Sequence, residues 1–367
     1  MKSACFLTGG VDICPIGGYK VVYEYANRLV RKGWDVAIVY PMVQTGNLYP
    51  RFLFRHPKAI KQLWRYWTSF RHGKEDGGSW FPLDSRVKKI YPLQNSPRVA
   101  RRLPQGTKFI ATYIPTVVDL NRFDVPESCK FNFVQGFEAW GEWTSEKVFE
   151  TYRYPMTKIA ISQWLADTVA EAGAKAIVVP NGLDFEYFRL SRPISERAPA
   201  SIAMLWHIEP QKRTEDIVEA LKIVRKSHPE LQVTAFGATP APSNLPEWIN
   251  YHHRPDRELH NRIYNEASIF VAASEQEGWG LTPCEAMQCG AAVVCTDIGG
   301  YRMFAKNGET ALMSPARDPQ ALAANICRLI EDNKLRIRIA EAGNKNIHQF
   351  AWDSSVTLFE SVLNGEV

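Results

Sequence analysis

Residues 274–290, with the sequence SEQEGWGLTPCEAMQCG, decide the fold that we expect for this chain. A short apolar run precedes this stretch at residues 268–273 (SIFVAA), and another follows it at residues 291–295 (AAVVC). Both runs are typical of buried parallel strands, and the stretch between them predicts a loop and a short helix that ends at Gly290. Ligands bind such a strand–helix–strand unit at the carboxyl ends of its strands, so we expect residues 274–282 to lie on a binding edge.

The glycine-rich turn in this stretch is suited to bind an anion. Its two glycines allow a tight turn and a close approach of the backbone to a ligand. With Thr282 as the N-cap, Pro283 and Glu285 occupy the first and third helical positions, as in a capping box. The free N–H groups and the positive dipole end of such a helix attract phosphate. Two interpretations stay open for each acid: Glu285 is a cap or a ligand contact, and Glu277 is a solvated charge or a ligand contact.

The composition indicates an α/β chain of two domains. It has 367 residues, of which 45% are hydrophobic, so it can bury two sizeable cores. No apolar run approaches the roughly 20 residues of a membrane span, and we expect no signal peptide before Gly9. The seven cysteines are odd in number and scattered, which favours buried thiols in a reducing cytoplasm over a disulfide framework or a zinc site.

Alternating strands and helices are expected on both sides of a linker. Residues 1–8 predict a strand and residues 19–32 a helix, and residues 201–206 and 214–226 repeat this order. Residues 188–200, with two prolines and many charges, predict the linker. We expect an N-terminal domain over residues 1–189, a second domain over residues 190–346, and a C-terminal helix in residues 347–367 that packs back on the first domain.

Polar groups follow several of the expected strands. Residues 207–213 (HIEPQKR) come after one strand and offer Lys212 and Arg213 as cations for phosphate. Gly17 and Gly18 precede the first helix, which is typical of a phosphate-binding loop, but a simple turn is equally compatible because G-x-G-x-x-G is absent. A further strand is expected at residues 130–135, and the polar and aromatic residues at its end are suited to contact a substrate.

A cationic, aromatic segment begins at Arg51 and ends at Lys74. It holds seven Lys or Arg residues and no acid. After Pro57 its apolar residues fall at helical spacing, with basic residues around the rest of the circumference, as in a helix that lies in a membrane interface. The alternative is a helix that packs its aromatic stripe on its own domain. Residues 1–180 carry a net charge of +10 and residues 181–367 one of −5, which suggests that the first domain faces an anionic membrane or an acidic acceptor.

Taken in order, these residues resemble the family-4 (group 1) glycosyltransferases of the GT-B fold. The most specific element runs from Glu277 to Glu285 and is similar to the E-x7-E signature of these retaining enzymes. The resemblance covers nearly the whole chain. It implies two facing Rossmann-like domains with a nucleotide sugar bound between them. Further features fall where the family has its usual ones, namely the glycine pair 17–18, VPNGLD at 179–184, Lys212, the glycine pair 299–300 and FAW at 350–352.

The resemblance implies a role for each residue of the donor site. Glu285 would accept hydrogen bonds from the ribose hydroxyls, and Glu277 would contact the donor sugar. Lys212 would neutralise the charge that develops on the leaving diphosphate. The diphosphate would also meet the backbone N–H groups of Gly280, Leu281 and Thr282, and Gly17 and Gly18 from the first domain.

This sequence departs from the family at two places. The family often has an arginine shortly before the lysine, and His207 stands there, so the second diphosphate cation would be Arg213 or a protonated His207. The acceptor side has no plain counterpart of the family's histidine. Gln135 and Glu138 are the nearest candidates.

The activity implied is a retaining transfer of a hexose or deoxyhexose from a nucleoside diphosphate sugar, which is a co-substrate rather than a cofactor. The acceptor would be a glycan or a lipid-linked molecule in cell-surface polysaccharide assembly, reached in the cytoplasm or at the inner face of the membrane, and no nucleic acid is expected as a partner. No metal site is expected, because D-x-D is absent and the histidines lack ligand spacing. A GT-B isomerase or hydrolase of nucleotide sugars and a noncatalytic sugar-binding protein stay open as alternatives.

Overall fold

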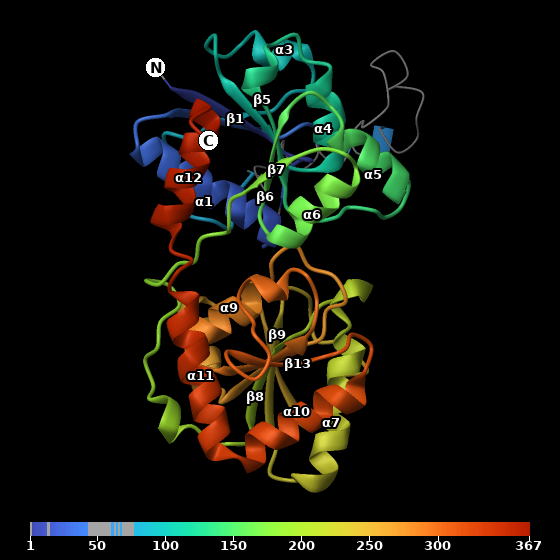
Figure 1. Ribbon diagram of the computed structural model, residues 1–367, viewed down its shortest axis with the longest axis vertical. Helices are drawn as coiled ribbons and strands as arrows, with labels where there is room; N and C mark the ends of the chain where they lie inside the picture. The colour runs from blue at the N-terminus through green and yellow to red at the C-terminus, as the bar shows by residue number, and fades with distance from the viewer. Residues whose placement is uncertain (1, 13–14, 43–59, 62–63, 65–66, 68–76) are drawn as a thin grey trace. The chain divides into compact units, whose positions relative to one another are not determined.

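The computed structural model describes residues 2–12, 15–42, 60–61, 64, 67 and 77–367 (Figure 1). The chain divides into two units. Unit 1 comprises Met1–Asn181 with Asp353–Val367, and unit 2 comprises Gly182–Trp352. Most of the segment from Arg51 to Lys74 lies outside the described residues, so its membrane contact stays a prediction. None of the helices within the described ranges is long and apolar enough to cross a membrane.

Unit 1 is built on a parallel sheet in which the described strands have the order β3-β2-β1-β4-β5-β6-β7. The first strand is central and pairs with β2 on one side and β4 on the other. This is the order of a Rossmann-like sheet, in which the strands are parallel and the order of their connection reverses between β1 and β4. The strands are β1 (Ser3–Leu7), β2 (Asp35–Val39), β3 (Lys88–Ile90), β4 (Lys108–Ala111), β5 (Lys130–Val134), β6 (Thr157–Ala160) and β7 (Ala176–Val178).

The helices of unit 1 connect these strands, and the last helix of the chain packs against its core. Phe359 of that helix stacks on Tyr25 and on Phe6 and meets Phe133 edge to face. This apolar anchor holds the C-terminal helix on unit 1, as expected. The helices are α1 (Gly17–Arg31), α3 (Pro97–Ala100), α4 (Ile114–Asn121), α5 (Ser145–Tyr152), α6 (Gln163–Glu171) and α12 (Trp352–Asn364), with a short 3-10 turn η2 (Glu127–Cys129).

Unit 2 has a second parallel sheet, in which the described strands have the order β10-β9-β8-β11-β12-β13. Its first strand is again central, so the order repeats that of unit 1 and places the switch point between β8 and β11. Its inner strands β11 and β12 bury every side chain, on both faces of the sheet, as parallel strands covered by helices do. The strands are β8 (Ser201–Leu205), β9 (Gln232–Gly237), β10 (Ile249–His253), β11 (Ile269–Ala272), β12 (Ala292–Thr296) and β13 (Ala311–Ser314).

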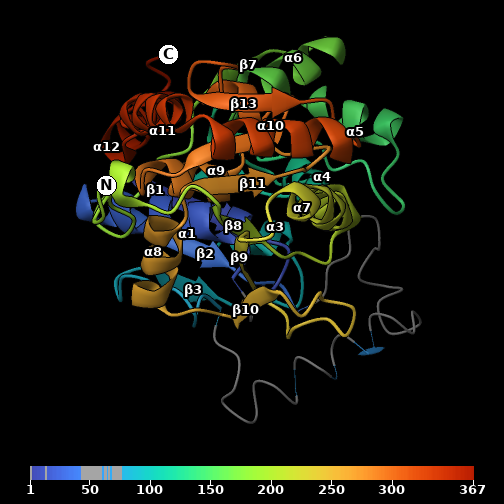
Figure 2. The same cartoon turned by 90° about the horizontal axis from the view of Figure 1, so that it is seen from below.

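Helices cover both faces of the unit 2 sheet. Figure 2 shows α7 on one side of the strands and α8 on the other. Two Rossmann-like units of α/β structure therefore confirm the fold class expected from the sequence. The helices are α7 (Thr214–Ser227), α8 (Arg257–Glu266), α9 (Leu281–Gln288), α10 (Pro319–Glu331) and α11 (Asn333–Ile347), with 3-10 turns η3 (Ile194–Glu196), η4 (Pro210–Lys212) and η5 (Tyr301–Met303).

The division between the units differs from the boundaries at 189 and 346 expected from the sequence. The Leu183 backbone N–H donates to the Phe350 carbonyl at 2.8 Å, so unit 2 already includes the chain ahead of the expected linker. Phe188 then packs edge to face on His260 and Tyr264. The proline-rich segment is therefore part of the packed surface of unit 2, which a composition of prolines and charges does not predict.

Candidate functional site

The loop and helix of residues 274–290 form as expected, but the helix begins two residues earlier than the capping-box interpretation requires. Helix α9 has Gly280 as its N-cap, with φ 105°, and no side chain caps it. Only glycine adopts this backbone readily, and a Cβ there would collide with the ring of Tyr301. Glu285 is consequently the fifth helical residue, too far along to cap the first turn. The cap interpretation of Glu285 is wrong, and Gly290 ends the helix with φ 82°.

Glu285 instead accepts a hydrogen bond from a buried tyrosine. The Tyr264 hydroxyl, from α8, donates to Glu285 Oε2 at 3.1 Å, and the Glu285 side chain is buried. Burial and the charge of Glu285 raise the pKa of Tyr264, so the phenol keeps its proton and remains a donor. Tyr264 is itself stacked on His260. The carboxylate therefore has a fixed orientation.

The structure brings Lys212 and Glu277 together at the carboxyl edge of the unit 2 sheet. Lys212 Nζ lies 2.6 Å from Glu277 Oε1, and Ser274 Oγ donates to the same oxygen at 2.9 Å. The two loops are also joined through the backbone, since the Glu275 N–H donates to the Gln211 carbonyl at 2.9 Å. Both side chains of the ion pair keep some exposure, 25% for Lys212 and 15% for Glu277. A cation and a carboxylate thus form an ion pair at a partly exposed site beside the start of α9.

Two other candidates in the same loop are engaged locally. Arg213 is the N-cap of α7 in a left-handed conformation, and its guanidinium makes two bonds to Asp216 at 2.7 and 2.9 Å. The Nδ1 atom of His207 accepts from the Glu209 N–H at 3.1 Å. Burial, followed by the charge of Lys212, lowers the pKa of His207. Both effects favour the neutral imidazole and so weigh against a protonated His207, whose role as the second diphosphate cation stays a prediction.

In unit 1, the glycine pair and the two acceptor-side candidates share one edge of the sheet. Gly17 and Gly18 open α1, and a Cβ at Gly18 would lie 3.5 Å from Gln135 Nε2. Gln135 Nε2 also donates to the Thr112 carbonyl at 3.4 Å. Glu138 Oε2 accepts from the Ile114 N–H at 2.7 Å, at the first residue of α4. Desolvation raises the pKa of Glu138 to about 8, against the opposing effect of this hydrogen bond.

Sequence reasoning missed three residues that shape the unit 2 site. Ser274 and Tyr264 orient the two glutamates, as described above. Arg317, in the loop after β13, has a positive φ of 61° and binds Glu275 through two bonds of 2.8 and 2.9 Å. Ser274 stands in the quoted stretch and could have been chosen as a donor three residues before Glu277. Tyr264 and Arg317 carry no local signal, because their partners lie far away in the sequence.

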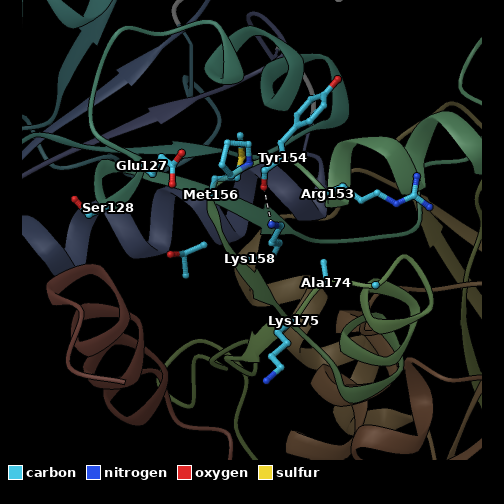
Figure 3. Close-up of a pocket in the computed structure, with 11 residues that line it drawn as sticks. Glu127, Ser128, Arg153, Tyr154, Met156, Lys158, Ala174 and Lys175 are labelled. Carbon is cyan, nitrogen blue, oxygen red and sulfur yellow. Dashed lines mark hydrogen bonds between the residues drawn. The ribbon is translucent and has the colours of Figure 1, made fainter.

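A pocket of about 470 Å³ lies elsewhere in unit 1 (Figure 3). Its lining includes Lys158, whose Nζ donates to the Tyr154 carbonyl at 2.7 Å, and Lys175. It lies where β6 and β7 begin, at their amino ends, and parallel sheets bind ligands at the opposite edge. None of the candidate site residues lines this pocket.

Within the described ranges, no group of three or more His, Cys, Asp or Glu side chains is placed to hold a metal ion. Six cysteines are described and all are free thiols. Transfer without a metal stays a prediction for solution measurement.

Known proteins resemble the chain in sequence. The model of the family "Glycosyl transferases group 1" matches residues 193–346. A D-inositol 3-phosphate glycosyltransferase of Corynebacterium efficiens is 25% identical over 262 residues, which are 65% of this chain and 60% of that protein. A phosphatidyl-myo-inositol mannosyltransferase of Mycobacterium tuberculosis is 25% identical over 210 residues, or 53% of this chain and 56% of that protein. The chain thus spans less than two thirds of either relative.

Solved structures resemble it in fold. Anabaena Alr3699/HepE, in a complex with UDP-glucose, superposes with a TM-score of 0.72 at 14% identity, over 100% of both chains. Sucrose-phosphate synthase from Thermosynechococcus elongatus gives 0.71 at 15% identity, over 100% of this chain and 99% of that one. These identities show the fold alone. Residues 193–346, most of unit 2, thus resemble the group 1 glycosyltransferases, and the chain has the GT-B fold.

Proposed function

We propose that this chain is a retaining glycosyltransferase that transfers a hexose or deoxyhexose from a nucleoside diphosphate sugar to a hydroxyl of a glycan or lipid-linked acceptor. The observation that carries the proposal is the Lys212–Glu277 pair, 2.6 Å apart beside the start of α9 and inside the region that the family model matches.

The start of α9 supports a diphosphate site. The backbone N–H groups of Gly280, Leu281 and Thr282 belong to the N-cap and first turn, where a helix has no carbonyl partners of its own for them. Lys212 adds a full positive charge on the adjacent loop. Arg213 contributes less, because its guanidinium already pairs with Asp216.

Glu277 and Glu285 support the two sugar contacts of such a donor. Carboxylates accept hydrogen bonds from paired hydroxyls, which both a ribose and a hexose offer. Glu277 lies beside Lys212, so a donor hexose that it binds would have its phosphate bond next to the lysine. Glu285, oriented by Tyr264, would accept hydrogen bonds from the ribose hydroxyls.

The reaction that these groups support is a substitution at the anomeric carbon. The acceptor oxygen bonds to that carbon while the bond from carbon to phosphate oxygen breaks, and the electron pair leaves with the diphosphate. The hydroxyl proton passes to an oxygen of the leaving phosphate, on the face from which the acceptor enters, so configuration is retained. Lys212 stabilises the charge that grows on the diphosphate, and we propose that no metal ion is required.

The relatives support the class of acceptor and donor. Two of them are described as acting on inositol phosphate or phosphatidyl-inositol, and one structural neighbour holds UDP-glucose. We propose that this chain works in the cytoplasm, in agreement with its free thiols, and the segment from Arg51 to Lys74 would bring it to an anionic membrane surface.

A thermal-shift screen against UDP-, GDP- and dTDP-sugars tests the proposal. A donor that binds only the native state raises its unfolding temperature, and we expect one nucleotide series to do so. The same donor is then incubated with and without added glycan or lipid acceptors. Release of free sugar at the same rate in both would identify a hydrolase, and an altered nucleotide sugar without release would identify an isomerase. Binding of sugars with no turnover of any donor would indicate a noncatalytic protein.

A further inference from the structure

A buried arginine joins the ends of two helices in unit 2. Arg197 is 2% exposed, and arginine is almost never buried so completely without a paired acid. The hydrogen bonds that its guanidinium makes with the described residues nevertheless all go to backbone carbonyls. These carbonyls belong to Arg192 at 2.9 Å, Tyr264 at 3.4 Å, Ala267 at 2.9 Å and Cys289 at 2.5 Å.

Three of these carbonyls lie at helix ends. Tyr264 lies in the last turn of α8, Ala267 is the C-cap of α8, and Cys289 is the C-cap of α9. The last carbonyls of a helix have no partner within it and form the negative end of the helix dipole. Two such ends around one guanidinium supply the negative potential that a carboxylate otherwise gives. Burial lowers the pKa of Arg197 to about 10, so the side chain keeps its charge at pH 7.

The same two helices make the hydrogen bond that orients Glu285. Tyr264 of α8 donates to Glu285 through its hydroxyl, while its carbonyl accepts from Arg197. On α9, the Cys289 N–H donates to the Glu285 carbonyl at 3.1 Å, while the Cys289 carbonyl accepts from Arg197. Helices α8 and α9 also pack against each other (Figure 2). Arg197 therefore contacts each helix next to the residue that forms the Tyr264–Glu285 bond.

We propose that Arg197 is a positioning residue, which holds Tyr264 against Glu285 by joining the C-terminal ends of α8 and α9. A guanidinium is suited to this task because its N–H donors form a rigid planar fork, so that it bonds carbonyls of both helices at once. An ammonium is a point charge and does not span them in this way. That Glu285 binds ribose hydroxyls rests on the proposed function, whereas the positioning of its carboxylate does not.

Arg336 provides a matched control in the same unit. It is 1% exposed, and it donates to the Leu329 carbonyl at 3.1 Å and to the side-chain oxygen of Asn333. These partners belong to α10 and to its own helix, α11. Its guanidinium bonds to the described residues thus reach neither α8 nor α9. Arg336→Met removes a buried cation of the same kind and leaves the junction of α8 and α9 in place.

A double-mutant cycle tests the positioning without any nucleotide. Tyr264→Phe removes the hydroxyl that bonds to Glu285, and its effect on the unfolding temperature is measured in the wild type, in Arg197→Met and in Arg336→Met. We expect a smaller effect in Arg197→Met, because the bond is already loosened there, and the full effect in Arg336→Met. An effect of the same size in all three backgrounds would overturn the proposal.

Calorimetry with nucleotides tests what the positioning does. The ligands are UDP or GDP, whichever the wild type binds, and its 2′,3′-dideoxy analogue. Arg197→Met should weaken the ribonucleotide about fivefold and the analogue little, and Arg336→Met should weaken neither. Arg197→Lys keeps the charge but not the fork, so it should show the same selective loss with a smaller loss of stability. If Arg197→Met does not fold, Arg197→Lys replaces it in both measurements.

The outcomes separate the positioning from the proposed function. Selective loss in Glu285→Gln without selective loss in the Arg197 variants would overturn the positioning. A loss that Arg336→Met shares would also overturn it, because any missing buried cation would then have the same effect. Coupling to Tyr264 without ribose selectivity in Glu285→Gln would keep the positioning and remove the ribose contact. If the wild type binds no nucleotide, the proposed function fails and the double-mutant cycle alone decides the role of Arg197.

Discussion

Lys212 and Glu277 form a 2.6 Å ion pair although they come from loops that follow two different strands of unit 2. Ser274 donates to the same carboxylate oxygen, so Glu277 is oriented by two donors. Such a pair positions both groups before a donor arrives. It also requires Lys212 to divide its hydrogen bonds between Glu277 and any diphosphate that binds.

Replacing Lys212 by alanine should reduce transfer far more than it reduces stability. The lysine is partly exposed, and its loss removes a preorganised charge at a developing anion, which corresponds to roughly 3 kcal/mol or about 10²-fold in kcat/KM. Steady-state kinetics with the donor found in the screen provide the measurement. Lys222→Ala, which removes an exposed lysine paired to Glu219 on the same unit, is the control and should keep the wild-type rate. Near wild-type kcat/KM for Lys212→Ala would remove this residue from the mechanism.

Replacing Glu285 by glutamine should weaken the binding of ribonucleotides selectively. The glutamine still accepts from Tyr264 but binds hydroxyl groups less strongly, because it is neutral. Calorimetry should show about a tenfold loss for UDP or GDP, whichever the wild type binds, and little change for the 2′,3′-dideoxy analogue. An equal loss for both nucleotides would indicate a structural role for Glu285 and no contact with ribose.

The sequence predicts the fold of this chain well because its signals are local and repeated. Buried parallel strands appear as short apolar runs, as at Ser201–Leu205 and Ile269–Ala272, and helices appear through their spacing. The start of α9 was misplaced by two residues, since Gly280, with its positive φ, is the N-cap, whereas Thr282 has the residue type that usually occupies this position. The domain boundary was misplaced because Phe188 and Leu183 find partners far along the chain.

The residues of the site could be predicted only where a side chain of suitable chemistry follows the carboxyl end of a strand. Lys212 and Glu277 follow adjacent strands, and their meeting agrees with the rule for parallel sheets. The local pairing of Arg213 with Asp216 depends on a left-handed residue, and the lowered pKa of His207 depends on burial. Neither feature can be read from residue types, and the same is true of the raised pKa of Glu138.

Transfer should survive removal of divalent metal ions. Lys212 and the N-terminus of α9 supply the positive charge that a metal would otherwise bring to a diphosphate. Turnover is measured after dialysis against excess EDTA and again after addition of Mg²⁺. Activity that disappears with EDTA and returns with Mg²⁺ would contradict this expectation.

The segment from Arg51 to Lys74 should bind anionic lipid in a salt-dependent way. Its seven basic residues and no acid lead us to expect flotation with vesicles that contain phosphatidylserine or phosphatidylglycerol, and much less with phosphatidylcholine alone. Raising the ionic strength should release the protein, because screening weakens exposed charges. Equal flotation with both kinds of vesicle would favour a helix that packs on its own domain.

Stability should depend on pH through Glu138. Desolvation raises its pKa to about 8 in the folded chain, whereas the unfolded chain has the ordinary value of 4.5. Between these values the folded state holds a proton that the unfolded state has released, so the free energy of unfolding falls as pH rises and levels off above about 8. Glu138→Gln carries no such charge and keeps an acceptor for the Ile114 N–H. The unfolding temperature of the wild type minus that of the variant should therefore fall between pH 5 and pH 9.

Asp119 provides a matched control for this titration. It is also buried in unit 1, and desolvation raises its pKa to about 7. The difference between the wild type and Asp119→Asn should also fall with rising pH, but it should level off about one pH unit earlier than the difference for Glu138→Gln. Melting curves at half-unit steps from pH 5 to pH 9 resolve the two. A difference for Glu138→Gln that stays constant over this range would mean that Glu138 ionises normally in the folded chain, and its hydrogen bond to the start of α4 would then outweigh its desolvation.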